Sequence, residues 1–304
     1  MIRNFMVVVI VGTLGWAAPY SESNAKTLDK NRAEVIDKFA NITTEQSPLG
    51  GTAICRGSHC TRRVRPVRIR RLKSQKNQIT DDQTWMTQVG FVSGRLTLDR
   101  TAQLFPKVPL SMKEKRFVFA SCMGVGQPVT TAYGIRPPRY RWTPSLTVLV
   151  SDYLGNPMRV FDLTKLKLPT AVKDGDETFV NRHIQYAEAR GNVLYLSLGH
   201  KTYAASSKGQ NAHILAFDIK SGALLWQSEP LVSNANNFVF VGDVIIAGYG
   251  FTAEPDFIYQ INRYSGKTLK RLKVKSGPDY FFLKPPGLLH VRTYDTNYLF
   301  QLTR

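Results

Sequence analysis

The stretch that decides the fold is Ala216-Phe217-Asp218-Ile219-Lys220-Ser221-Gly222-Ala223-Leu224-Leu225-Trp226. It closes one copy of a repeat whose period is about 45 residues. In a second copy, Ile258-Tyr259-Gln260-Ile261 and Ser265-Gly266 lie 44 positions beyond their counterparts in the first, and a partial third copy covers Tyr298 to Leu302. Repeats of this length built from short strands are typical of propeller blades, because one blade cannot bury its apolar faces alone.

The turn inside this repeat has a clear chemistry. Asp218 can accept backbone hydrogen bonds in the bend, Ser221 supports the bend, and Gly222 supplies a positive φ. We expect the Trp226 ring to lie against the adjacent blade, where it would bury about 150 to 250 Å². The structural motif comprises Ala216, Asp218, Ser221, Gly222 and Trp226, with Ser265 and Gly266 as its second copy.

Short runs rich in Val, Ile, Phe, Tyr and Leu continue from Trp85 to Arg304, separated by Gly, Asn, Asp and Pro. Long helical periodicity is missing after Ala40. We therefore predict an all-β domain over residues 85–304, a β-propeller of about five four-stranded blades. The predicted strands are 87–92, 95–98, 116–121, 146–151, 158–162, 193–198, 213–218, 224–226, 238–241, 244–247, 257–262, 269–274, 288–292 and 298–302.

The motif from Ala216 to Trp226 resembles the tryptophan-docking motif of pyrroloquinoline-quinone-like (PQQ-like) β-propeller repeats, with Ser221 in place of the usual threonine. That family includes eight-bladed quinoprotein dehydrogenases and also non-catalytic scaffolds, among them an outer-membrane assembly lipoprotein. The chain differs from the enzymes because it lacks an adjacent cysteine pair and a haem-binding motif. It differs from the lipoprotein because no cysteine follows its N-terminal apolar run. The resemblance implies a secreted, non-catalytic propeller and leaves its ligand open.

The N-terminus has the features of a secretory signal. Arg3 supplies a positive charge, Phe5 to Trp16 is apolar, and small residues follow. An uncleaved anchor is the alternative, but the apolar run is shorter than the roughly 20 residues that a membrane-spanning helix needs. We assign residues 1–25 to the signal, predict no transmembrane segment after its removal, and expect an extracytoplasmic protein, periplasmic or secreted. Residues 26–45 favour a short amphipathic helix.

The next segment is strongly basic. The chain of 304 residues carries a formal charge of +19, and residues 46–80 contain nine basic side chains and no acidic one. Like charges at this density repel, so we predict an extended or disordered linker over residues 46–84. It is either an arm that binds an anionic partner or a solvated connection. The candidate binding residues are Arg62, Arg63, Arg65, Arg68, Arg70 and Arg71.

Cys55 and Cys60 are close enough in sequence to close a small disulfide loop in an oxidising compartment. Free thiols and a metal site are the alternatives. Haem attachment would require a histidine where Thr61 stands, and zinc would require four ligands where Cys55, His59 and Cys60 provide three. We therefore predict a disulfide.

No catalytic, cofactor or metal site can be assigned from the sequence. Glu254 and Asp256 lie in one predicted loop, Asp279 and Asp295 lie in later ones, and the histidines are scattered over unrelated repeat positions. Loop acids of this kind usually cap turns.

The leading hypothesis is an exported, non-enzymatic propeller that binds another protein or an anionic cell-envelope polymer. A small quinoprotein-like oxidoreductase or a polysaccharide lyase or hydrolase is the alternative. Nucleic acid is not expected as a partner, because no aromatic residues interleave with the arginines. The sequence does not specify the oligomeric state.

Overall fold

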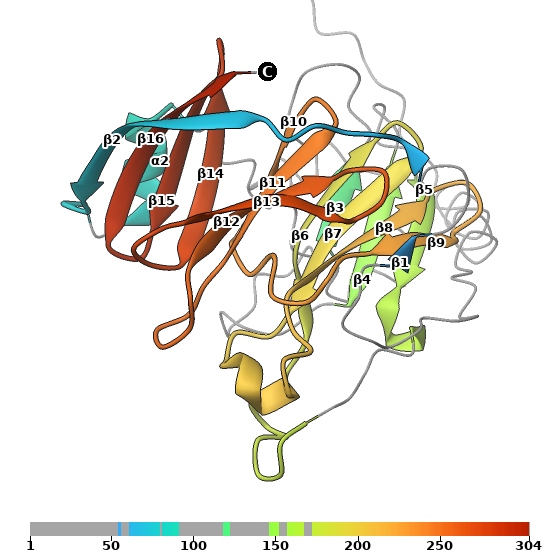
Figure 1. Ribbon diagram of the computed structural model, residues 1–304. Helices are drawn as coiled ribbons and strands as arrows, with labels where there is room; N and C mark the ends of the chain where they lie inside the picture. Colours follow the sequence, from blue (N-terminus) through green and yellow to red (C-terminus); the bar gives the residue numbers. More distant parts are fainter. Residues whose placement is uncertain are drawn as a thin grey trace, which may run out of the picture.

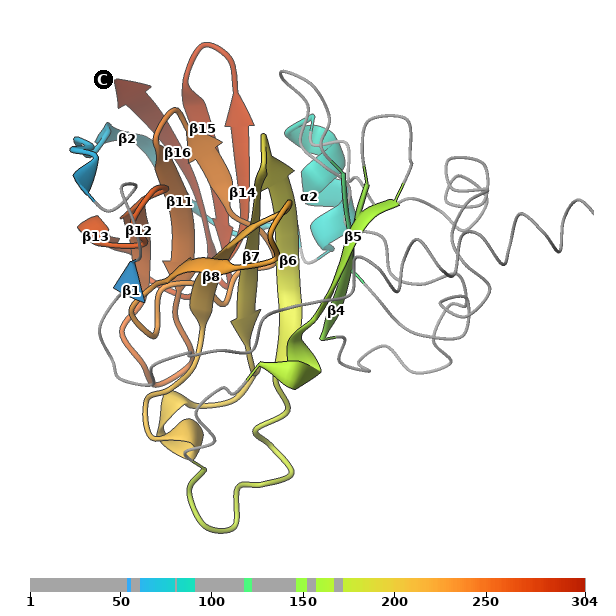
Figure 2. The same ribbon diagram turned by 90° about the vertical axis from the view of Figure 1, so that its right-hand side faces the viewer.

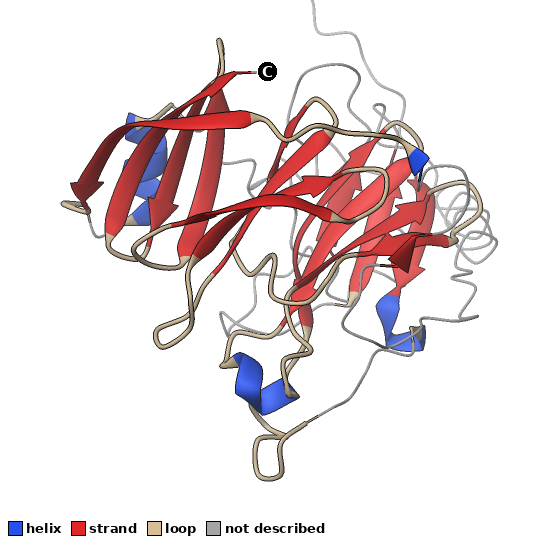
Figure 3. Ribbon diagram, viewed as in Figure 1, coloured by secondary structure: helices blue, strands red, loops and turns tan. Residues whose placement is uncertain are grey.

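The computed structural model of the chain describes residues 54–55, 61–79, 81–90, 118–121, 146–151, 157–166 and 172–303. These residues form four β-sheets and a few short helices (Figure 3). Most sheets are antiparallel meanders in which strands that follow one another in sequence are neighbours in space. The predicted all-β, propeller-like fold is confirmed.

We call the four sheets blades I to IV in chain order (Figure 1). Blade I contains β3 (Val118–Ser121), β4 (Thr147–Ser151) and β5 (Pro157–Asp162). Blade II contains β6 (His183–Arg190), β7 (Val193–Gly199), β8 (His213–Asp218), β9 (Leu224–Gln227) and the short β1 (Ile54–Cys55). Blade III contains β10 (Val239–Val241), β11 (Val244–Tyr249), β12 (Phe257–Asn262) and β13 (Thr268–Lys273). Blade IV contains β14 (Pro278–Lys284), β15 (Leu288–Thr293), β16 (Thr296–Thr303) and β2 (Arg68–Lys76).

Successive blades pack face to face, and the seams between them hold the hydrophobic core. Val148 and Phe161 of blade I join Leu215 of blade II in one buried cluster. Similar clusters fill the seams between blades II and III and between blades III and IV. Neighbouring blades touch through the strands that come first in each blade: β6 of blade II contacts β3 and β4 of blade I, and β14 of blade IV contacts β10 and β11 of blade III. Figure 2 shows the resulting fan of sheets.

Blade IV takes its fourth strand from the N-terminal part of the chain. β2 pairs antiparallel with β16, from Arg68 opposite Thr303 to Lys76 opposite Thr296. Of the extended or disordered linker predicted for residues 46–84, this stretch is extended, but it is a paired strand of blade IV and not a linker that precedes the sheets. Charge repulsion favours an extended chain, and an outermost strand is extended. Because its charged side chains can still reach water there, the basic segment can pair with β16.

Trp226 lies at the seam between blades II and III, as the repeat predicts. Its side chain is buried, and its Nε1–H donates to the carbonyl oxygen of Arg263 at 3.1 Å, in the turn that follows β12. Gly266 in that turn lies directly against the indole, because a Cβ built there would be 2.5 Å from Trp226 Cε3. The preceding turn is also as expected, with Asp218 accepting from the Ser221 amide at 2.6 Å and Gly222 at φ +77°.

An arginine has the corresponding role at the seam between blades I and II. Arg159 on β5 donates through its guanidinium to the carbonyl oxygens of Ile219 and Lys220, both at 2.5 Å. Those carbonyls belong to the turn after β8, which corresponds to the turn that receives Trp226 one blade later. Two adjacent seams are thus fixed by a donor from one blade that binds turn carbonyls of the next.

The strand predicted at 87–92 is wrong in its described part, because Asp82–Gln88 is the helix α2. Asp81 caps it by accepting from the Thr84 amide and hydroxyl at 2.8 and 2.6 Å. Trp85 and Met86 are buried, and the Trp85 ring lies 6.4 Å from that of Tyr280 on blade IV. Two adjacent residues, Trp85 and Met86, are both buried, whereas a strand would place them on opposite faces. This burial and the Asp81 cap favour a helix over a strand.

Other strand predictions match closely, and four described strands were missed, namely β1, β2, β6 and β14. β8 and β12 have the predicted bounds. Blade I departs from the expected antiparallel four-stranded form because β3 and β4 run parallel.

Several predictions lie outside the described residues. They are the signal at 1–25, the helix at 26–45, the strand at 95–98 and the remaining blade of the predicted five. No helix in the described part of the chain has the length and hydropathy that a membrane crossing requires.

Gly266→Ala tests the seam contact, and Gly191→Ala is its matched control. Both glycines have positive φ, +71° and +58°, but a Cβ at Gly191 would meet nothing within 4 Å. We expect the control to lose about 1 kcal/mol of unfolding free energy and Gly266→Ala to lose about 1 to 3 kcal/mol more, because the new methyl group collides with the indole. Urea unfolding measures both, and equal losses would contradict the contact.

Candidate functional site

The basic segment runs across the outer side of the propeller as a strap. We use this name for residues 61–76, which lead from the edge of blade II to blade IV (Figure 1). Over blade III, Val67 makes a two-way contact with the buried Gln260: its amide donates to Gln260 Oε1 at 2.7 Å, and its carbonyl accepts from Nε2 at 2.8 Å. Because Gln260 is buried and the contact satisfies both its polar groups, the crossing has a fixed register.

The start of the strap is anchored by charge. The Arg62 guanidinium lies 4.2 Å from the centre of the Tyr264 ring and 3.6 Å from Asp243, and its carbonyl accepts from Asn262. All three partners belong to blade III. These contacts fix the start of the strap on blade III, and the Asp243 carboxylate neutralises part of the Arg62 charge.

The remaining candidate arginines are exposed to solvent. Arg63 and Arg65 are exposed in the crossing, and Arg68, Arg70 and Arg71 are exposed on β2. None of these five lies within ion-pair distance of a carboxylate in the part of the chain that the structure describes. The structure thus brings the six predicted arginines onto one strap and leaves five of them exposed without a carboxylate partner among the described residues.

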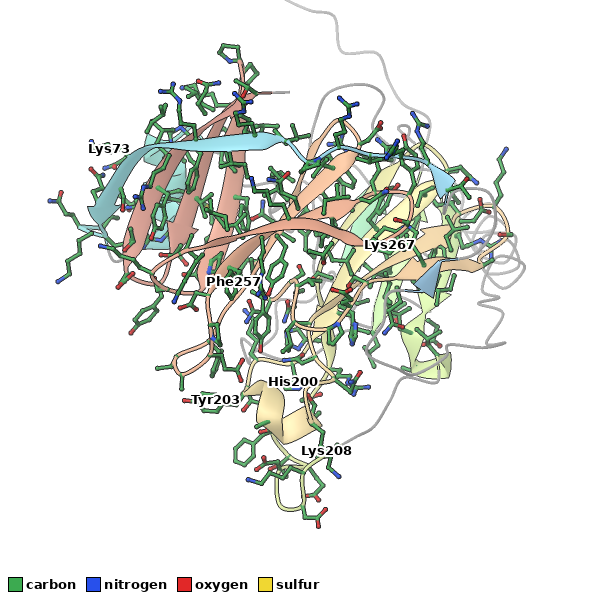
Figure 4. All side chains as sticks on the ribbon, in the orientation of Figure 1. Lys73, His200, Tyr203, Lys208, Phe257 and Lys267 are labelled. Atoms are coloured by element: carbon green, nitrogen blue, oxygen red, sulfur yellow. The ribbon has the colours of Figure 1, made fainter. Side chains whose placement is uncertain are left out.

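β2 is a solvent-facing edge along nearly its whole length. Only Ile69 is partly buried, and Leu72 is 44% exposed between Arg71 and Lys73. Lysine and arginine on an outermost strand also oppose edge-to-edge aggregation. Figure 4 places Lys73 on this rim, far from the end of the propeller that carries His200.

At that other end, three titratable groups from separate segments, Lys201, Asp82 and Asp279, influence one another near the start of β14. Lys201 donates to Asn236 Oδ1 at 3.1 Å, and the Asn236 amide donates to the Asp279 carbonyl oxygen at 2.8 Å. Burial raises the pKa of Asp279 to about 6, and the negative charge of Asp82 adds to the rise. Burial also lowers the pKa of Lys201, despite the attraction of Asp279 and Asp82. Both shifts favour the neutral forms, so desolvation outweighs the attraction between these charges.

A second acid with a shifted pKa lies in the loop between β11 and β12. Burial raises the pKa of Asp256 to about 6, helped by the charges of Asp295 and Glu254. Its carboxylate fits against backbone, since a Cβ at Gly250 would be 2.0 Å from its Oδ1. Glu254, in the same loop, accepts hydrogen bonds from the Ala204 amide at 2.6 Å and from the Tyr249 hydroxyl, and so connects this loop to the segment that begins at Ala204.

The pair formed by Ser207 and His200 has the composition of a nucleophile and its base, but its hydrogen bonds exclude that role. The Asn211 amide group donates to His200 Nδ1, so the ring proton is on Nε2, which donates to Ser207 Oγ at 2.8 Å. Burial lowers the pKa of His200 to about 4, and Ser207 is fully buried. A base that already carries the proton at the serine cannot accept another, and no substrate can reach the hydroxyl.

Sequence reasoning missed the cluster around Lys201 and Asp279, because its members come from separate segments and share no linear motif. Among the described residues, no group of three or more His, Cys, Asp or Glu is arranged to hold a metal ion. Cys55 is on β1, opposite Trp226, whereas Cys60 lies outside the described residues, so their disulfide stays a prediction.

No protein-family model matches the chain, and no curated protein matches it significantly. Solved structures with partial likeness include BamB from Moraxella catarrhalis, at 14% identity over 38% of this chain and 43% of that one, with a TM-score of 0.27. A protein of unknown function from Bacteroides caccae gives 11% identity over 59% and 54%, with a TM-score of 0.33. The computationally designed Ika8 protein gives 12% identity over 39% and 46%, with a TM-score of 0.22. The aligned part spans about half of each of these chains, and the fold assignment rests on the sheets described above.

Asp279 makes the free energy of unfolding depend on pH. Its folded-state pKa of about 6 exceeds the ordinary 3.8, so the folded state binds the proton more tightly than the unfolded state. Its contribution to stability is full below about pH 4 and is lost as pH rises through about 6. Asp279→Asn lacks this titration. Between pH 4.5 and 7.5, the unfolding free energy of the variant should therefore rise by about 1 to 2 kcal/mol relative to that of the wild-type protein.

Urea unfolding of both proteins at the two pH values measures that change. Comparing the variant with the wild-type protein cancels the titration of His200 and His213, which acts in the opposite direction because burial lowers their pKa values to about 4. A difference that stays constant with pH would contradict the raised pKa of Asp279.

Proposed function

We propose that this chain is an exported, non-enzymatic β-propeller of the PQQ-like repeat kind, which acts as a binding scaffold at the cell envelope. Its partner is an anionic cell-envelope polymer, held through the strap, or another protein. The observation that carries this proposal is the set of exposed arginines over residues 63–71, which have no carboxylate partner among the described residues. Three of them, Arg68, Arg70 and Arg71, stand on the paired strand β2.

Rigidity distinguishes this surface from a flexible tail. A disordered arm loses conformational entropy when it binds, whereas β2 is already fixed by its pairing with β16 and by the Val67–Gln260 contact. The arginines therefore meet an anionic ligand in a preset spacing. Each contact with a phosphate or carboxylate releases counterions, so the affinity should fall steeply with salt.

The variant Arg68→Gln/Arg70→Gln/Arg71→Gln tests this function by removing three charges while retaining long polar side chains. Its control, Lys173→Gln/Lys208→Gln/Lys220→Gln, removes three exposed charges from loops of the propeller away from β2. Binding of the purified full chain to lipopolysaccharide and to lipoteichoic acid is measured between 50 and 400 mM salt. A basic residue close to an anionic surface contributes about 1 kcal/mol, so we expect the β2 variant to bind at least about tenfold more weakly.

The control should bind within about twofold of the wild-type chain at each salt concentration. Unchanged binding by the β2 variant would contradict the proposal. Equal losses in the two variants would also contradict it, because net charge rather than a defined surface would then govern binding. Thermal unfolding of each variant establishes that the fold is retained.

A further inference from the structure

A second basic strand lies on the same side of the propeller as the strap. β13, the outermost strand of blade III, carries Lys270, Arg271 and Lys273, and Lys267 and Lys275 flank it. All five side chains are exposed. Residues 267–275 contain no acidic residue, and none of these five lies within ion-pair distance of a carboxylate in the described ranges.

β2 and β13 flank the seam between blades III and IV. Val67, next to the start of β2, binds Gln260, and Gln260 is the pairing partner of Lys270 on β13. Leu269 and Leu272 of β13 and Ile69 of β2 pack on the same hydrophobic cluster. Both views of the ribbon place the two strands on one side of the molecule (Figures 1 and 2). Figure 4 marks this side with Lys73 and Lys267.

Protection of sheet edges does not account for this arrangement by itself. Acidic residues or proline would also protect an edge, yet both strands carry only positive charges. β2 and β13 are thus two outermost strands of neighbouring blades that carry basic residues and no acidic ones.

We infer that β2 and β13 form one composite site for a linear polyanion that crosses from one blade to the next. This inference rests on the proposed function and extends its site to Lys267, Lys270, Arg271 and Lys273. The ligand class is a flexible linear chain of repeating anionic groups, of which a polyphosphate is the simplest, since the basic residues of each strand extend over about 20 to 30 Å at ~3.3 Å per residue. A chain that reaches both rows binds the second one at a high effective concentration.

Arg271 has a further role within this site. Its guanidinium lies 4.8 Å from the centre of the Phe257 ring, which fixes the side chain on the surface of blade III. The flanking lysines make no such contact among the described residues. They can therefore be neutralised without disturbing packing, whereas Arg271 cannot.

The test compares Lys267→Gln/Lys270→Gln/Lys273→Gln with Arg68→Gln/Arg70→Gln/Arg71→Gln in the full chain. Calorimetry measures binding of long-chain polyphosphate, which can reach both strands, and of tripolyphosphate, which can occupy only one. We expect each variant to bind long polyphosphate at least about tenfold more weakly than the wild-type chain. We expect the stoichiometry of tripolyphosphate to fall from two per chain to one in either variant.

The outcomes separate the two proposals. If the β13 variant binds long polyphosphate within twofold of the wild-type chain while the β2 variant is weakened, the composite site is wrong and the proposed function stands. If neither variant is weakened towards polyphosphate, lipopolysaccharide or lipoteichoic acid, both are wrong. If anionic phospholipid vesicles bind more tightly than long polyphosphate and polyphosphate does not compete with them, the ligand is a membrane surface and the linear polyanion is excluded.

Discussion

The pairing of β2 with β16 is the contact on which the rest of the surface depends. β16 is the last strand of the described chain, and without β2 its outer edge would expose a row of unpaired backbone groups. The N-terminal strand satisfies those groups and must then carry side chains that tolerate an outermost position. Charged residues meet that condition, so the most basic segment of the chain and the edge of blade IV occupy the same place.

β1, the strap and β2 together add contacts to three blades, beyond the seams along which those blades already pack. β1 extends blade II, Val67 binds Gln260 of blade III, and β2 completes blade IV. Such long-range contacts add cooperativity to a repeat fold, in which each unit otherwise contacts only its neighbours. The seams themselves are fixed by donors to turn carbonyls, from Trp226 in one case and Arg159 in another. A basic surface supported in this way has a fixed geometry.

Much of the fold could be predicted from the sequence because its signals are local. β8 and β12 are runs of apolar residues that end in turn-forming ones, and Trp226 follows its turn at a fixed spacing. β6 was missed because it contains Gln185, Glu188 and Arg190, and β14 because it begins with proline and aspartate. The pairing of β2 had no local signal, since its partner lies more than two hundred residues away. The arginines of the candidate site were found by charge alone, but their fixed geometry was not foreseen.

The most direct test of this account is hydrogen–deuterium exchange along residues 68–76 in the full chain. If β2 is a paired strand, the amides that face β16 exchange at least about a hundredfold more slowly than in an unstructured peptide of the same sequence, and the amides between them exchange fast. Uniformly fast exchange along this segment would show a disordered linker. The strap, the rigid row of arginines and the site that spans two blades would then all be contradicted.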